Sequence, residues 1–312
     1  MNPLIAIVGP TASGKSQLAL RLAQRFNGEI VSADSRQVYR LMDIGTAKPS
    51  RSEMSLVPHH LIDIISPDED FSLAQYQQMA YRAIDDIRRR DKLPLLVGGS
   101  GLYLWAVVEG WQIPEVTPDA EFRQRLEARA AQGDGEELYR ELAQIDLAVA
   151  RRIDWRNLRR VIRALEVAKT KGVRVPQPQA KVAPSYDTLL IGLTTERKEL
   201  YRRIDQRVDN MIEQGLVDEV KGLLQMGFSM DLPAMSGIGY KQVGQYLSGE
   251  LTLEAAIQQI KTETHRLVRR QYNWFRLKDE RIRWFDINDA KTEAEIEALV
   301  GRFIRSGTNL SP

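Results

Sequence analysis

Short apolar runs alternate with segments of helical spacing along the first 110 residues. The apolar runs are rich in aliphatic and β-branched residues and predict buried strands at 4–8, 28–33 and 93–99. Hydrophobic residues three and four positions apart predict a helix after each strand, over 16–26, 73–90 and 102–110. Ser72 and Gln75 form a capping-box pattern at the start of the second helix. Alternating strands and helices predict a parallel sheet with a ligand site at the carboxyl ends of its strands.

The pattern changes after residue 112. Thr117 followed by Pro118 predicts the start of a helix, and helical spacing continues from there to about residue 170. A proline-interrupted loop at 173–184 then precedes an apolar run at 188–193 that predicts a further strand. The sequence therefore predicts an α/β core of residues 1–112 and 188–312, with residues 113–187 as a helical insertion.

The rest of the chain has mostly helical spacing again. Helices are predicted at 196–214, 216–226, 240–248, 253–278 and 292–305. Thr292 and Glu295 form a second capping-box pattern at the start of the last of them. We find no internal repeat and no low-complexity segment, so the chain is predicted to be one α/β core with one insertion.

Composition narrows the possible functions. The 312 residues are 43% hydrophobic and 28% charged and carry a net charge of +2, which is typical of a globular protein. The sequence contains no cysteine, which excludes disulfides, cysteine-based zinc sites and thiol catalysis. No apolar run approaches the ~20 residues that span a bilayer, and no signal-peptide pattern precedes the first strand. We therefore expect a cytoplasmic protein with no membrane partner.

Basic residues gather in two segments. Residues 151–163 contain six arginines and one aspartate, and residues 261–285 interleave basic side chains with Tyr272, Trp274 and Phe275. Basic residues with aromatic neighbours suit the phosphates and stacked bases of RNA. Solvated helix faces above packed aromatic rings would give the same pattern, so either segment alone leaves both interpretations open.

Residues 9–16, Gly-Pro-Thr-Ala-Ser-Gly-Lys-Ser, match the P-loop pattern G-x-x-x-x-G-K-[ST]. A predicted strand precedes the motif and a predicted helix follows it, which is the context that this loop requires. Its backbone N–H groups bind anionic oxygens, Lys15 reaches across two phosphates, and the hydroxyl of Ser16 can hold Mg²⁺. The motif predicts a phosphate or pyrophosphate site in a P-loop NTPase-like core.

The acidic residue expected beside such a loop is in an unusual place. Nucleotide-hydrolysing P-loop proteins keep a magnesium-binding Asp at the end of another strand, but the candidate strand here ends in Gly98-Gly99-Ser100-Gly101. Asp34 instead follows the second strand, where it could act as a general base on an acceptor that attacks the bound phosphate compound. An Asx turn would explain Asp34 alone, but it does not explain Ser35 and Gln37 beside it.

Several motifs together resemble one known family. In order they are GPTASGKS, ADSRQVYRLMDIGTAKP, PHHLIDI, GGSGLYL, RALEV, RVDNM, GIGYKQ and RRQYNWFR, and they cover residues 4–286. In this order they resemble the bacterial tRNA dimethylallyltransferases, also called tRNA isopentenyltransferases. The resemblance implies transfer of a dimethylallyl group from dimethylallyl pyrophosphate to the exocyclic N6 amine of the adenosine 3′ of the anticodon. The acceptors are tRNAs that read codons beginning with U.

The resemblance also implies roles for individual residues at the reaction centre. Asp34 removes a proton from the attacking amine, Arg207 assists at the pyrophosphate, and Lys15 and Mg²⁺ neutralise the charge of this leaving group. Ser100 stands where the family usually has Thr, and it retains the hydroxyl that meets the adenosine. The pyrophosphate is cradled by Gly9, Pro10, Thr11, Ala12, Ser13, Gly14, Lys15 and Ser16.

The tRNA anticodon stem-loop is expected to meet several stretches. They are Asp34, Ser35, Arg36 and Gln37; Ser100; Arg123; Arg159, Arg160, Val161, Ile162 and Arg163; and Gly237, Ile238, Gly239, Tyr240, Lys241 and Gln242. Arg159 replaces the Gln that is commoner in the family, which adds a cation. Because the target base must be flipped out toward Asp34 while the donor arrives from another direction, we expect a channel open at both ends.

Three other functions remain as alternatives. A small-molecule P-loop kinase shares the phosphate loop and the acid after the second strand but has no use for GIGYKQ. An adenylate isopentenyltransferase needs no RNA-binding insertion, and an RNA-binding protein with a vestigial P-loop would not need Lys15, Ser16 and Asp34 intact. His59, His60 and His265 lack the spacing of a metal site, so we interpret His60 as structural. We expect a monomer.

Overall fold

The computed structural model describes residues 2–113, 119–171, 184 and 186–308, and it forms two compact units. The first unit comprises residues 1–108 and 184–312, and the second comprises residues 109–183. The sequence placed these boundaries at 113 and 187. The predicted helix start at Thr117-Pro118 and residues 173–183 of the predicted loop lie outside the described residues.

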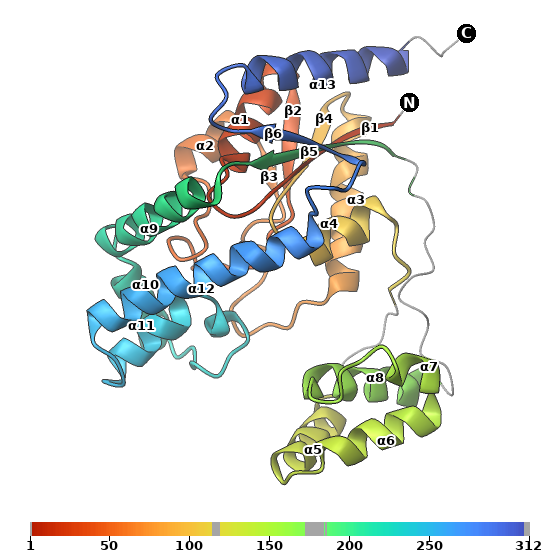
Figure 1. The fold of residues 1–312 in the computed structure, drawn as a ribbon, viewed down its shortest axis with the longest axis vertical. Coiled ribbons are helices and arrows are strands. Elements are labelled where there is room, and N and C mark those ends of the chain that lie inside the picture. The colour runs from red at the N-terminus through yellow and green to blue at the C-terminus, as the bar shows by residue number, and fades with distance from the viewer. Residues whose placement is uncertain (1, 114–118, 172–183, 185, 309–312) are drawn as a thin grey trace. The chain divides into compact units, whose positions relative to one another are not determined.

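The first unit is built on a six-stranded sheet with every pair of neighbouring strands parallel (Figure 1). Its spatial order is β3-β2-β4-β1-β5-β6. The strands are β1 Pro3–Val8, β2 Gly28–Ser32, β3 His59–His60, β4 Leu93–Val97, β5 Asp187–Thr194 and β6 Ile282–Asp286. The parallel sheet and strands β1, β2, β4 and β5 were predicted from sequence, whereas β3 and β6 were not. From β1 the chain continues to β2, which lies beyond β4 on one side of β1, whereas β5 is the neighbour of β1 on the opposite side. In open parallel sheets ligands bind where the strand order reverses in this way, so the carboxyl end of β1 is the expected binding position.

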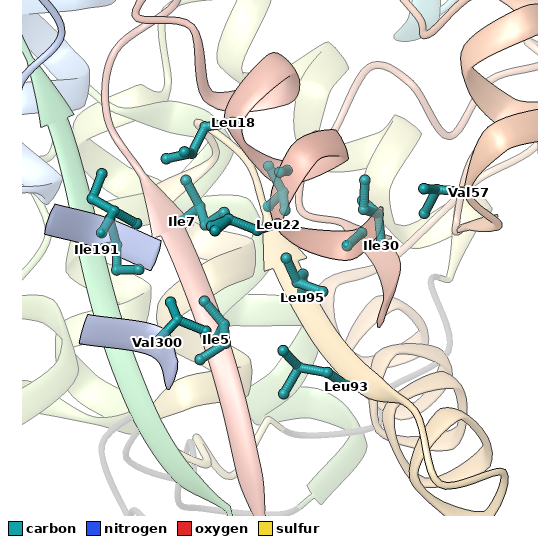
Figure 2. Close-up of a cluster of buried hydrophobic side chains, with 14 of the residues drawn as sticks. Ile5, Ile7, Leu18, Leu22, Ile30, Val57, Leu93, Leu95, Ile191 and Val300 are labelled. Atoms are coloured by element: carbon teal, nitrogen blue, oxygen red, sulfur yellow. The ribbon is translucent and has the colours of Figure 1, made fainter. Parts of the chain in front are cut away.

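The described part of this unit contains the helices α1 Lys15–Arg25, α2 Arg51–Leu56, α3 Leu73–Arg89, α4 Gly101–Val108, α9 Arg197–Glu213, α10 Leu216–Gln225, α11 Tyr240–Leu247, α12 Leu253–Trp274 and α13 Thr292–Thr308. Of these, α1, α3 and α13 contact the sheet, whereas α9, α10, α11 and α12 pack mainly on one another. A short 3₁₀ turn spans Ala234–Ser236. Aliphatic residues of α1 and α13 pack on one face of β1, β2, β4 and β5 (Figure 2). Each such side chain contributes about 1.5–3 kcal/mol when it leaves water, so this core fixes the carboxyl ends of the strands.

The two predicted capping boxes have different outcomes. Ser72 and Gln75 form theirs at the start of α3, with each side chain bonded to the backbone of the other. The prediction for Thr292 and Glu295 is wrong. The Thr292 hydroxyl instead donates to the carbonyl of Asp286, at 2.5 Å, and the Glu295 N–H donates to the carbonyl of Lys291. Helix α13 begins at Thr292 itself, so Thr292 lies in the first turn and not at the preceding N-cap position that a capping box requires.

The second unit is helical in its described part. It contains α5 Ala120–Ala131, α6 Gly135–Ile145, α7 Leu147–Ala150 and α8 Leu158–Lys171, around a small core that includes Leu126, Leu138, Leu142 and Leu165. The side chain of Asp119 caps α5 by accepting from the N–H of Phe122 at 3.0 Å. Among all the described residues, no helix has both the length and the apolar character needed to cross a membrane.

Candidate active site

A cavity of about 810 Å³ lies where β1, β2 and β4 end. Three loops line it, because each follows one of these strands: residues 11–16, 34–37 and 97–102. Helices α9 and α12 close it with Arg207, Arg270, Gln271 and Trp274. The structure therefore brings together the predicted phosphate loop, the residues after β2 and Ser100. Arg207, Ile238 and Gly239, from distant parts of the sequence, line the same cavity.

The phosphate loop has the backbone shape that an anion site requires. Gly9 has φ +143°, and a Cβ there would lie 2.4 Å from the carbonyl oxygen of Leu193, so only glycine fits. Ala12 and Gly14 adopt left-handed conformations at φ 63° and 76°, which turn successive N–H groups toward one side. Helix α1 begins at Lys15, and its first N–H groups have no acceptor within the helix.

Lys15 lies at the base of this loop, where its Nζ donates to the carbonyl of Pro10 at 2.5 Å. Burial, with the nearby positive charge of Arg207, lowers the pKa of Lys15 to about 7, although Asp34 acts in the opposite direction. A bound anion would restore the charged form of this amine. The lysine is therefore suited to an anionic ligand.

Arg207 extends into the cavity from α9, next to Ile204 and Val208, which are buried. Burial lowers the pKa of Arg207, while Asp34 raises it. Considered without its surroundings, an arginine in a helix would be expected to face solvent. The structure instead places it close enough to Lys15 and Asp34 for their charges to interact.

Asp34 begins the turn that follows β2. Its Oδ1 accepts from the N–H of Arg36 at 2.8 Å, which is the Asx turn considered from the sequence. Asp34 also lines the cavity with Ser35, so one carboxylate oxygen shapes the turn. The turn explains why the side chain is held in place, and it leaves Asp34 able to serve as a base.

Arg36 and Gln37 are already engaged by the protein. The guanidinium of Arg36 donates to the carbonyl of Pro233 at 2.9 Å. The amide of Gln37 accepts from Ser32 Oγ at 3.0 Å and donates to the carbonyl of Ala47 at 3.1 Å. Both side chains therefore hold the walls of the cavity, and both also line it.

Ser100 reaches the site because the backbones after β2 and β4 approach each other closely. A Cβ at Gly98 would lie 2.1 Å from the carbonyl oxygen of Ala33, and the Ser100 N–H donates to that same carbonyl at 3.2 Å. Glycine at position 98 is therefore required. The contact brings Ser100 and Asp34 to adjacent parts of one cavity wall.

Gln271 is a functional candidate that the sequence analysis missed. It lies in α12, only 8% exposed, and its Oε1 accepts from the N–H of Thr11 at 2.9 Å. Its Nε2 donates to the carbonyl of Gly99 at 3.1 Å. One side chain thus joins the phosphate loop to the loop after β4. The RRQYNWFR motif contained this residue, but no local pattern identified its partners, which lie more than 170 residues away.

The GIGYKQ motif divides into buried and exposed residues. Tyr240 and Gln242 are 1% and 5% exposed, and the Gln242 Oε1 accepts from the N–H of Gly239 at 3.0 Å. Lys241 is exposed and lines a neighbouring groove of about 690 Å³ with Gln245 and Arg266. Buried Gly237 also belongs to this turn. Of the motif's six residues, only Ile238, Gly239, Lys241 and Gln242 line either cavity.

Comparison with known proteins assigns the chain to a family. A family model described as IPP transferase matches residues 37–278. A tRNA dimethylallyltransferase of Dehalococcoides mccartyi is 48% identical over 98% of this chain and 94% of its own length. The chain belongs to the IPP transferase family.

Solved structures of related transferases have the same fold as this family member. A crystal structure of a tRNA isopentenylpyrophosphate transferase from Bacillus halodurans matches 99% of both chains, with 43% identity and a TM-score of 0.73. A eukaryotic dimethylallyltransferase, solved acting on tRNA, matches 97% of this chain and 80% of its own, with 29% identity and a TM-score of 0.83. The predicted fold class and the predicted family are therefore both confirmed.

The predicted arginines of the second unit fall into two groups. Arg159 and Arg160 are exposed, and neither forms an ion pair within the described part of this family member. Arg123 and Arg163 both bind the buried carboxylate of Glu166, at 3.1 and 3.2 Å. Val161 and Ile162 are in the core of the unit, at 0% and 4% exposure, so their side chains do not face a partner.

The residues at the phosphate loop suit a magnesium ion that is held mainly by its substrate. The described residues contain no cluster of three or more His, Cys, Asp or Glu side chains that could hold a metal. Ser16 at the start of α1 is exposed and lines the cavity. Mg²⁺ usually keeps several waters and binds through substrate phosphates with one or two protein ligands, so a single hydroxyl fits this ion.

Proposed function

We propose that this member of the family transfers a dimethylallyl group from dimethylallyl pyrophosphate to the N6 amine of the adenosine 3′ of the anticodon. The acceptors are tRNAs that read codons beginning with U, and pyrophosphate is released. One observation carries the proposal. The cavity contains both a phosphate loop and a carboxylate after β2, while β4 is followed by Gly98, Gly99 and Ser100 without the acid of a nucleotide hydrolase.

The reaction balances with the groups in this cavity. The bond from the allylic C1 to the pyrophosphate oxygen breaks, and a bond from C1 to N6 of the adenine forms. The proton leaves N6 for the carboxylate of Asp34, which makes a weakly nucleophilic aromatic amine reactive. Lys15, Arg207 and the N–H groups at the start of α1 stabilise the charge that grows on the departing pyrophosphate.

Ser16 and the pyrophosphate oxygens would hold Mg²⁺, which would neutralise part of that charge. Ser100 lies beside Asp34 on the cavity wall, where its hydroxyl can bond the target adenosine. The exposed indole of Trp274, 40% accessible, lines the same cavity and offers a face on which a base can stack.

We also propose that the second unit contacts the stem of the RNA. Arg159 and Arg160 support this because they are exposed and make no ion pair with described residues. Nearby Arg151, Arg152 and Arg156 share both properties, whereas Arg140 of α6 pairs with Glu136 at 3.0 Å. Unpaired guanidinium groups can neutralise phosphates without first breaking an internal pair.

The test uses purified protein, Mg²⁺, dimethylallyl pyrophosphate and an anticodon stem-loop with three adenosines from the last anticodon position onward. Mass spectrometry should find one dimethylallyl group on the RNA. Parallel reactions replace the RNA by AMP, or supply ATP with nucleosides. Product on AMP alone would indicate an adenylate transferase, and phosphoryl transfer from ATP would contradict the proposal.

Asp34→Asn provides the matched variant for the base. An asparagine Oδ1 can still accept from the N–H of Arg36, so the turn persists while the proton acceptor is lost. We expect turnover to fall by on the order of 10²- to 10⁴-fold, the range of general-base contributions, with unchanged binding of the donor. Turnover within a few-fold of the wild type would remove Asp34 from this role.

A further inference from the structure

Three successive backbone N–H groups in the loop of residues 43–47 (the 43–47 loop) point at one carboxylate, that of Glu219 in α10. Glu219 Oε2 accepts from Asp43 at 2.9 Å and from Ile44 at 2.7 Å. Its Oε1 accepts from Gly45 at 3.2 Å and from the Tyr240 hydroxyl at 2.6 Å. Successive N–H groups of this kind make an anion-binding concavity. The protein fills it with its own carboxylate, so it is not a second phosphate site.

Tyr240 secures this arrangement from the other side. A Cβ at Gly45 would lie 2.5 Å from Cε2 of the tyrosine ring, so the ring packs directly on the loop backbone. Burial and the Glu219 carboxylate raise the pKa of Tyr240, which keeps the phenol protonated and able to donate. The buried tyrosine of GIGYKQ therefore has a partner within the protein.

The 43–47 loop is connected to Asp34 by hydrogen bonds. The carbonyl groups of Thr46 and Ala47 accept from the amide of Gln37, at 3.4 and 3.1 Å. Gln37 belongs to the turn that Asp34 begins and that the bond from the Arg36 N–H to Asp34 closes. Residues 45–47 also form part of the cavity wall, whereas Glu219 does not line the cavity.

We propose that Glu219 is a positioning residue that holds the 43–47 loop and, through Gln37, fixes the turn that presents Asp34 to the acceptor nucleoside. Glu219 does not touch the reacting atoms. It lies almost 180 residues from the loop in sequence, and four hydrogen bonds converge on it. The effect on turnover rests on the proposed function, but the effect on the loop does not.

Glu219→Gln keeps the size of the side chain and replaces one acceptor oxygen by a donor. Because displacement of a reacting group by about 1 Å can cost 10²-fold, we expect kcat on the stem-loop to fall by roughly tenfold to a hundredfold. The KM for dimethylallyl pyrophosphate should stay within about twofold, since the phosphate loop is held separately by Gln271. Hydrogen exchange at the amides of residues 43–45 should become faster.

Asp218→Asn is the matched control, because Asp218 is the preceding residue of α10, is exposed and carries the same charge. It should leave turnover and exchange unchanged. Tyr240→Phe removes one of the four bonds and should give a smaller loss of kcat in the same direction. This variant keeps the test valid where Glu219→Gln fails to fold.

Two outcomes overturn the assignment: unchanged exchange at residues 43–45 in Glu219→Gln, or an equal loss of donor affinity, which would indicate a general disturbance of the fold. Failure of the proposed function has a different signature. There the wild-type protein forms no prenylated RNA, whereas the exchange measurement still reports whether Glu219 holds the loop.

Discussion

Gln271→Met replaces the side chain that joins the phosphate loop to the loop after β4 with an apolar one of similar length. The Thr11 N–H and the Gly99 carbonyl would each lose their partner, at 2.9 and 3.1 Å in the wild type. A Cβ at Gly99 would lie 2.3 Å from Gln271 Nε2, so the glutamine fills this space closely. Methionine would keep the packing and remove only the polar contacts.

The magnitude follows from two polar groups left without partners. An unsatisfied buried donor or acceptor costs about 1–3 kcal/mol, and both groups lie beside a cavity that water can enter. We therefore expect the free energy of unfolding to fall by about 2–3 kcal/mol, near the lower end of the summed range. Loosening of the phosphate loop should weaken donor binding by on the order of tenfold, which corresponds to about 1.4 kcal/mol.

Urea unfolding and calorimetric titration with dimethylallyl pyrophosphate measure the two effects. Asn273→Ala is the control, because Asn273 is exposed two residues further along α12, and it should change neither quantity. Gln271→Glu separates the two bonds, since it keeps the acceptor for Thr11 but places an oxygen opposite the Gly99 carbonyl. An unfolding free energy of Gln271→Met within 0.5 kcal/mol of the wild type, below the cost expected for a lost bond, would refute the reasoning.

Two further predictions concern charge. Because the pKa of Lys15 is lowered to about 7, most of this amine is neutral at pH 8, and donor binding there should take up close to one proton. Calorimetry in two buffers of different ionisation enthalpy measures this uptake, and Lys15→Arg should abolish it; no uptake by the wild type would contradict the prediction. Glu29 is buried at 1% exposure and binds Arg90, Lys92 and His60, and hydrogen bonds from Arg90 lower its pKa. The stability that it adds is present above its unfolded pKa of about 4.5 and is lost as pH falls below that value. Glu29→Gln should therefore cost about 2 kcal/mol at pH 7 in urea unfolding, and a difference from the wild type that persists undiminished at pH 3 would argue against this linkage.

The fold was largely predictable because its signals are local. The apolar runs of β1, β2, β4 and β5 and the P-loop between β1 and α1 each lie within a few consecutive residues. Strand β3 has only two residues, and β6 overlaps the basic segment of residues 261–285, which offered another interpretation. Their pairing depends on neighbouring strands, so the sequence pattern alone did not reveal them. The structural interpretation of His60 is confirmed by its 2.7 Å contact with Glu29.

The sequence predicted the loops of the candidate site but not the helix residues that hold these loops in place. Asp34, Ser100 and the phosphate loop follow strands, and parallel strands bring such residues together. Gln271 and Glu219 act on loops that are distant in sequence, and nothing in their own helices indicates these partners. Within RRVIR the family motif did not distinguish Arg159 and Arg160, which face solvent, from Val161 and Ile162, which form core.

Gln271 and Glu219 also restrict where an anion can bind in the first unit. The N–H of Thr11 donates to Gln271, and those of residues 43–45 donate to Glu219. An anion in the cavity is therefore left with the other N–H groups of the phosphate loop, the start of α1, and the cations Lys15, Arg207 and Arg270. These donors suit a phosphate compound, and the loop after β4 supplies no acid for a nucleotide-bound metal. The contrast with a nucleotide hydrolase thus rests on the missing acid, and the position of the anion rests on the donors that remain.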